Sequence, residues 1–390
     1  MSTAGSPISV FNDLMRGTGP TIYTGVDEFI NETVLRSYAI GKFMPEEDMG
    51  ELIQGSPKIR DYIIAEEANT FVDFHPNAVF SWQNPQVQKD WEIEWRYSMD
   101  HMAWNDHELI HQMGDASRLT SKARFQVYKD VKKGKEVRLQ TSIQNGLERA
   151  LFAVPDATQM EAADGLKVFS LWALVNEETN GLYPGFDTLQ GIDPTEYDFW
   201  VPNQITYDYD NYLGTNARNG LYNAFDRMRI RMNWRRPPRA GSIAGERYNK
   251  NRFIMTGEEG LLLYEDALRK SNDFLRSGNG KDPSYEGAQY RGYEIMEFQQ
   301  FDSSPVFAGG GGTTRVTQMA ADSPGPRFIW INAEYVRMVW HRERYFYAHE
   351  IMQHPNQPGA WRKPIELWRN MFVRSRRKGT GIIYPDAPSS

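Results

Sequence analysis

Cysteine is missing from this chain of 390 residues. Its absence excludes disulfide bonds, thiolate metal ligands and redox chemistry by thiols. A chain without cysteine fits synthesis in a reducing cytoplasm, although it does not require that compartment.

Long apolar segments are absent as well. No run of about 18 apolar residues occurs, which is the length a transmembrane helix needs. Residues 1–20 have neither the basic start nor the apolar stretch of a secretory signal. We therefore expect a soluble chain that is neither exported nor bound to a membrane.

An excess of charge of one sign is also lacking. Lys and Arg number 44 and Asp and Glu number 51, which leaves a net charge of -7. That balance excludes a globally basic nucleic-acid binder, although local basic patches remain possible. The length is ample for a large core and for two or three domains.

Most signatures of catalysis are missing. We find no nucleophile elbow, no dinucleotide fingerprint and no calcium loop of the EF-hand form. The run Gly309 to Gly312 is followed by Thr313 and Thr314 rather than by the Gly-Lys-Ser/Thr of a phosphate loop. It predicts a loop and no phosphate site.

One short motif does point to an enzyme. His107, Glu108 and His111 have the HExxH spacing that places two imidazoles one helical turn apart, as in zinc peptidases. Such sites need a third protein ligand. Gly114 fits one group of these enzymes, but Ser117 stands where that group has His or Asp. The alternatives are a zinc site and a chance match on a surface helix.

Aromatic residues are abundant instead, at 13% of the chain, with 11 Trp and 20 Tyr. Large aromatic side chains concentrate in interfaces because they bury much area at a low cost in conformational entropy. The composition favours a protein that makes extensive contacts with copies of itself.

A tryptophan-rich ribbon is the clearest local pattern. The β-prone residues 61–82 precede a turn signal at Asn84 and Pro85, and an alternating strand follows. Its apolar side consists of Trp91, Ile93, Trp95, Tyr97 and Met99. A two-stranded ribbon is marginal alone in water, so we expect it to lie against something else, with Trp82, Trp91 and Trp95 as the contact candidates.

The remaining elements alternate between helix and strand. Helical spacing of apolar residues predicts helices over 121–152 and 221–232, and Thr256 to Glu259 has the form of a capping box that opens another helix. The apolar run 168–175 suggests a buried strand, 290–301 a strand pair, and 327–384 a nearly continuous series of strands. A chain with a helical middle that ends in strands is α+β.

In this order, with Arg327 to Met352 and the basic turn Arg374 to Pro388 (RSRRKGTGIIYPDAP), the chain resembles the major capsid proteins of tailed double-stranded DNA bacteriophages, the Hong Kong 97-type fold. The resemblance implies five parts. They are an N-terminal arm (1–60), an extended β-hairpin loop (61–104), a peripheral domain with a long spine helix (105–193), an axial α/β domain (194–326), and return strands of the peripheral domain with the C-terminal segment (327–390).

The resemblance also implies a function. The chain would self-assemble as pentamers and hexamers into the icosahedral head shell around the phage DNA, without catalysis or cofactors. Scaffolding, portal and decoration proteins would be possible partners, the packaged DNA a non-specific neighbour, and the virion the location after assembly in the host bacterial cytoplasm. The alternatives are a zinc metallopeptidase and another virion protein of the tail or connector.

Six residues are candidates for contacts between subunits. They are Trp82, Trp91 and Trp95 of the ribbon and Arg374, Arg376 and Arg377 of the basic turn. Tryptophan and arginine are enriched where interfaces bind most strongly. The arginines are equally suited to phosphate or to a neighbouring subunit's acids.

Overall fold

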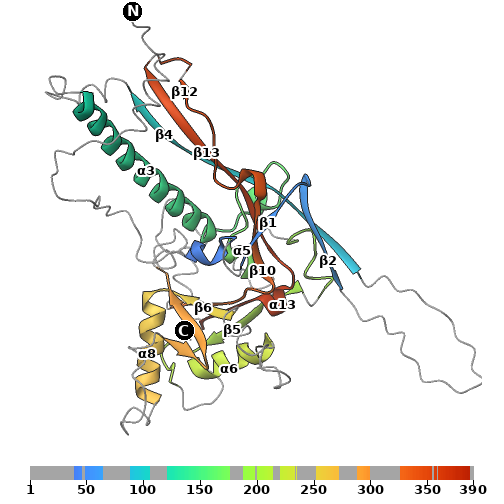
Figure 1. Ribbon diagram of the computed structural model, residues 1–390. Coiled ribbons are helices and arrows are strands. Elements are labelled where there is room, and N and C mark those ends of the chain that lie inside the picture. The colour runs from blue at the N-terminus through green and yellow to red at the C-terminus, as the bar shows by residue number, and fades with distance from the viewer. Residues whose placement is uncertain are drawn as a thin grey trace, which may run out of the picture. The chain divides into compact units, whose positions relative to one another are not determined.

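The computed structural model is α+β, as the sequence predicts, and describes thirteen stretches of the chain (Figure 1). These are residues 39–45, 49–64, 88–105, 121–175, 188–197, 200–213, 220–232, 234, 252–271, 288–298, 326–353, 355–357 and 359–386. The chain divides into two compact units. The smaller unit contains the described residues of Tyr97–Leu147 and His341–Trp368, and the larger one those of Arg36–Arg96, Glu148–Trp340 and Arg369–Ser390.

A mixed sheet of six strands forms the centre of the larger unit, in the order β5-β14-β9-β6-β8-β7. Its strands are β5 (Asn203–Tyr207), β6 (Arg252–Thr256), β7 (Gln289–Tyr290), β8 (Tyr293–Glu297), β9 (Phe328–Asn332) and β14 (Thr380–Pro385). Strands β6 and β9 are buried along their whole length, as expected for the middle of a covered sheet. Strand β14 brings the C-terminal end of the chain into this sheet, between β5 and β9.

Two helices, α6 (Leu221–Arg231) and α8 (Glu258–Ser271), lie beside this sheet (Figure 1). The predicted apolar side of α6 is confirmed, because Leu221, Phe225 and Met228 are buried in a core that also contains Trp234 and Trp330. The ring of Phe225 lies 5.2 Å from that of Trp330 and 5.6 Å from that of Tyr264 on α8. Aromatic packing thus joins both helices to the sheet.

A second sheet is built around the long strand β13 (Ala360–Val373). In the larger unit its end pairs with β10 (Val336–His341), which also neighbours β1 (Gly50–Ile53). In the smaller unit its beginning pairs with β11 (Tyr347–Ala348), β12 (Met352–Gln353) and β4 (Arg96–Asn105). The short helical elements η5 (Arg342–Arg344) and α13 (Arg376–Gly379) interrupt the series of strands predicted over 327–384.

The long helix predicted over 121–152 is confirmed as α3 (Ser121–Leu151). Leu139, Ile143, Leu147 and Leu151 are buried at the predicted spacing of four residues. The helix continues through Gly134 and Gly146, so the two glycines do not split it. None of the helices in the described stretches is both long and apolar enough to cross a membrane.

Residues 168–175 do not form the predicted strand, because Leu171–Val175 is the short buried helix α5. The Ser170 hydroxyl accepts a hydrogen bond from the Ala173 N–H at 3.3 Å, which caps the start of the helix. A short apolar run does not by itself distinguish a buried strand from a buried helix. Another short helix, α4 (Ala157–Met160), follows Pro155.

The prediction that Thr256 to Glu259 forms a capping box is also wrong. Thr256 is the last residue of strand β6, and helix α8 begins two residues later, at Glu258. The Thr256 hydroxyl donates a hydrogen bond to the Arg327 carbonyl at 2.9 Å. Its proton is therefore used next to the sheet and not at the start of α8. The strand pair predicted over 290–301 does form, as β7 and β8.

Candidate assembly site

Part of the predicted ribbon lies in the described residues, with β2 (Lys58–Ile64) antiparallel to β3 (Gln88–Glu94). Lys58 pairs with Glu94 at one end and Ile64 with Gln88 at the other. Residues 65–87 lie outside the described part of the chain, and so does the candidate Trp82. Both described strands of the ribbon belong to the larger unit.

One face of the ribbon packs into the subunit itself. Trp91 and Trp95 expose only 2% and 3% of their surface. The Trp91 ring lies 5.1 Å from that of Phe372 on β13, and the Trp95 indole N–H donates to the Ser56 carbonyl at 3.0 Å. These tryptophans therefore hold the ribbon to its own chain, and their burial leaves almost no surface with which to touch a neighbour.

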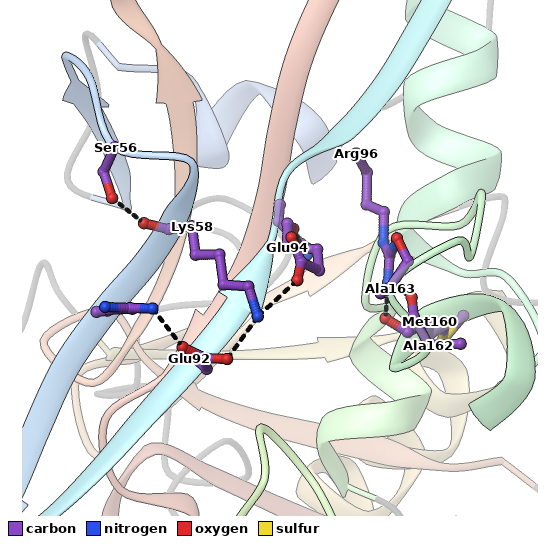
Figure 2. A network of polar contacts seen from close by, with 10 residues as sticks. Ser56, Lys58, Glu92, Glu94, Arg96, Met160, Ala162 and Ala163 are labelled. Carbon is purple, nitrogen blue, oxygen red and sulfur yellow. Dashed lines mark hydrogen bonds and ion pairs between the residues drawn. The ribbon is translucent and has the colours of Figure 1, made fainter.

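The opposite face is charged. The Lys58 ammonium lies 2.6 Å from a Glu92 carboxylate oxygen and 2.9 Å from one of Glu94, and Arg60 reaches Glu92 at 2.9 Å (Figure 2). The hydrogen bond from Lys58 lowers the pKa of Glu92, and the hydrogen bonds to Glu92 and Glu94 raise the pKa of Lys58. Because these groups are exposed, the pairs contribute little to stability, but they favour the observed strand register.

The predicted alternation breaks at Arg96. Up to Trp95 the odd-numbered side chains are buried, whereas beyond it Tyr97 and Met99 are exposed and the even-numbered Met102 and Trp104 are buried. The prediction that Tyr97 and Met99 share the buried side of Trp91 is therefore wrong. The two strands β3 and β4 are separate elements that meet at this change of phase.

The Arg96 guanidinium explains the change of phase. It is buried and donates to four backbone carbonyls, one at the end of α4 and three in the loop that follows (Figure 2). The acceptors are the carbonyls of Met160 (2.6 Å), Ala162 (2.7 Å), Ala163 (3.5 Å) and Gly165 (2.5 Å). A buried cation is tolerated when its donors are satisfied in this way. Arg96 thus fixes the point at which the chain leaves the ribbon.

The three arginines of the basic turn have different surroundings. The Arg374 Nε donates to the Asp61 carboxylate on β2 at 3.1 Å, which ties the turn to the ribbon. Arg376 is 3% exposed and donates to the Leu174 carbonyl at 3.1 Å, so its role lies inside the subunit. Arg377 is exposed, and its backbone carbonyl accepts a hydrogen bond from the Asn203 amide.

Solved structures that are similar to this chain include phage capsids. The chain aligns over 95% of its length with 98% of a chain in the Cyanophage A-1(L) capsid asymmetric unit, with a TM-score of 0.57 and 13% identity. It aligns over 94% of its length with 93% of a chain in the capsid of Cyanophage P-SCSP1u, with a TM-score of 0.52 and 11% identity. This chain has a phage capsid fold. The sequence matches no family model, and none of the curated proteins compared with it matches either.

The elements on which the resemblance rests, namely the ribbon, the long helix α3 and the strands from β9 to β14, are present in the described residues. The HExxH motif at His107, Glu108 and His111 lies outside the described residues, so the structure tests neither the zinc site nor the chance match. Within the stretches that the structure describes, no group of three or more His, Asp or Glu side chains could hold a metal ion.

Sequence reasoning missed Arg96, although a signal was available. Met102 and Trp104 are large apolar residues at even-numbered positions, whereas Trp91, Ile93 and Trp95 occupy odd-numbered ones. That change of parity within one strand-like stretch indicates a break between them. Of the residues between Trp95 and Met102, Arg96 has the most hydrogen-bond donors, because its guanidinium carries five N–H groups.

Proposed function

We propose that this chain is the major capsid protein of a tailed phage, which assembles as pentamers and hexamers into an icosahedral shell around double-stranded DNA. The observation that supports this best is the likeness in fold to the Cyanophage A-1(L) capsid chain, which extends over nearly the whole of both chains. On this proposal the protein is structural, has no catalysis of its own, and resides in the virion after assembly in the host cytoplasm.

The exposed surface of the smaller unit supports self-association. Tyr97 and Met99 expose 61% and 68% of their surface. They are two residues apart in β4 and therefore lie on the same side of the strand. Next to Tyr97, at 4.8 Å between rings, lies Trp368, over which the Arg344 guanidinium is placed at 5.5 Å. Exposed aromatic, Met and Arg side chains in one patch are typical of protein interfaces.

The six predicted contact residues divide accordingly. We assign Trp82, Arg374 and Arg377 to contacts between subunits, because Trp82 belongs to the segment between the two ribbon strands and the other two side chains retain exposed surface. We assign Trp91, Trp95 and Arg376 to support of the subunit, because their side chains are buried in it. The five parts with boundaries at 60, 104, 193 and 326 remain the proposed division of the chain. Scaffolding, portal and decoration proteins remain proposed partners.

Electron microscopy with negative stain, combined with sedimentation velocity, tests the proposal. The purified chain, alone or expressed with phage head proteins, should form capsomers, tubes or closed shells. A small monomer under every assembly condition would contradict the proposal, and rings or tubes that never close would favour a tail or connector protein. About one zinc per chain, lost together with peptidase activity in His107→Ala, would favour the metallopeptidase.

A further inference from the structure

A buried carboxyl group closes the start of the first described helix. Glu148, near the end of α3, is completely buried. Its Oε1 accepts a hydrogen bond from the Ala39 N–H and its Oε2 one from the Ile40 N–H, both at 2.9 Å. These are the first two residues of η1 (Ala39–Phe43), whose N–H groups have no partner within the helix.

The rest of this segment is seated by backbone groups and by apolar burial. Ala39, Ile40 and Phe43 are buried. The Trp340 indole N–H donates to the Phe43 carbonyl at 2.8 Å, and further along the chain the Met338 N–H donates to the Met49 carbonyl at 2.8 Å. Among these contacts, those made by Glu148 are the ones that can titrate.

Burial raises the pKa of Glu148 to about 7, although the hydrogen bonds from Ile40 and Ala39 act in the opposite direction. In the described part of the chain no charged side chain contributes to this pKa. Lys42 on η1 lies 3.9 Å from Glu294 instead, and Arg149, the next residue on α3, is exposed. The seated carboxyl group therefore holds a proton in a pH range where a solvated glutamate has lost it.

We propose that Glu148 is a proton-dependent latch that keeps Ala39–Phe43 seated on the end of helix α3 at low pH and loosens this segment as the pH rises. The latch is independent of the proposed capsid function, since it needs only the folded subunit.

The direction follows from proton linkage. In the loosened state a solvated Glu148 ionises near the ordinary value of 4.5, whereas in the seated state it ionises near 7. Between these values the opening constant of the segment rises about tenfold per pH unit, on the order of a hundredfold in total. Above the upper value it levels off, because Glu148 is then ionised in both states.

Hydrogen exchange followed by mass spectrometry tests the latch on the full chain. Exchange of residues 39–43 is measured from about pH 5 to about pH 8 and corrected for the intrinsic pH dependence of amide exchange, with strand β9 as an internal reference for global opening. We expect residues 39–43 to exchange faster than β9, and their protection to fall on the order of a hundredfold over this range. Equal protection of the two peptides at every pH would overturn the latch.

Three variants separate the latch from general destabilisation. Glu148→Gln cannot ionise, so protection of residues 39–43 should no longer depend on pH. Ala39→Pro removes one N–H that favours the charged carboxylate, at a position where a helix tolerates proline. The pKa of Glu148 should therefore rise, and the fall in protection should extend to higher pH. Glu51→Gln removes another acid of the larger unit, one that pairs with Arg337, and should leave the response intact. The proposal would be overturned if the pH response persists in Glu148→Gln. It would also be overturned if Ala39→Pro does not shift the response to higher pH.

Discussion

Two buried arginines in the larger unit have opposite surroundings. The Nη1 and Nη2 of Arg96 donate to four carbonyls, whereas the Nε and Nη1 of Arg369 have no hydrogen-bond partner among the described residues. The Arg369 guanidinium lies over the Trp340 ring at 5.7 Å, and burial lowers the pKa of this side chain to about 9. A buried charge without hydrogen-bond acceptors lowers stability. A buried charge with acceptors supplies the hydrogen bonds that its buried partner groups need.

Arg369→Met should therefore stabilise the subunit. Methionine fills a similar volume without a charge, so we expect the free energy of unfolding to rise by about 1–3 kcal/mol, measured by urea denaturation. The matched control is Arg96→Met, which removes the donor that serves four carbonyls and should lower the free energy of unfolding by about 3–5 kcal/mol. Of these carbonyls, that of Ala162 still accepts a hydrogen bond from the Gly165 N–H. A loss of stability in Arg369→Met as large as that in Arg96→Met would show that Arg369 has a partner.

Glu148 makes the stability of the fold depend on pH. Its pKa is higher in the folded chain than in the unfolded one, so folding retains the proton, and its contribution is most favourable below about pH 4.5. As the pH rises to about 7 this contribution is lost, and the free energy of unfolding should fall by about 3 kcal/mol. Urea denaturation across this range checks the slope, and the difference between the chain and Glu148→Gln isolates the share of this residue.

At the scale of elements, the ribbon depends on its tryptophans. Trp91 is buried against Phe372, whereas Tyr62, on the neighbouring strand, is exposed. Trp91→Ala should lower the free energy of unfolding by about 3–5 kcal/mol, because it opens a large cavity between the ribbon and β13. Tyr62→Ala on the same ribbon should change it by less than about 0.5 kcal/mol. Equal effects would mean that the ribbon does not rest on the subunit through Trp91.

At the scale of the whole molecule, exposed apolar side chains should matter for assembly and not for folding. Met99→Glu places a charge in the patch formed with Tyr97. If the chain assembles as proposed, we expect shells to be lost or to require at least about tenfold more protein, with unchanged thermal unfolding of the free subunit. Gln144→Glu adds the same charge at an exposed position of α3 that is already polar. Sedimentation velocity compares the two variants, and equal assembly would exclude this part of β4 from an interface.

Some features of the fold could be read from local patterns. The spacing of Leu139, Ile143 and Leu147 predicts the buried side of α3, and that of Phe225 and Met228 the buried side of α6, because one helix face repeats every three to four residues. The helical conformation of α5 could not be predicted from the sequence, because five apolar residues fit a strand as well as a helix. The cap from Ser170 is visible only once the helix exists.

The sequence by itself determined the α+β class, the absence of disulfides, the long helix and the tryptophan ribbon, since each depends on residue types or on spacings within a few turns or strand repeats. Only the tertiary structure decided which tryptophans and arginines face inward. The carbonyls that hold Arg96 are 64 to 69 residues away along the chain, and the amides that hold Glu148 are more than 100 residues away. Burial and hydrogen-bond partners at such separations are set by packing, which no local pattern encodes.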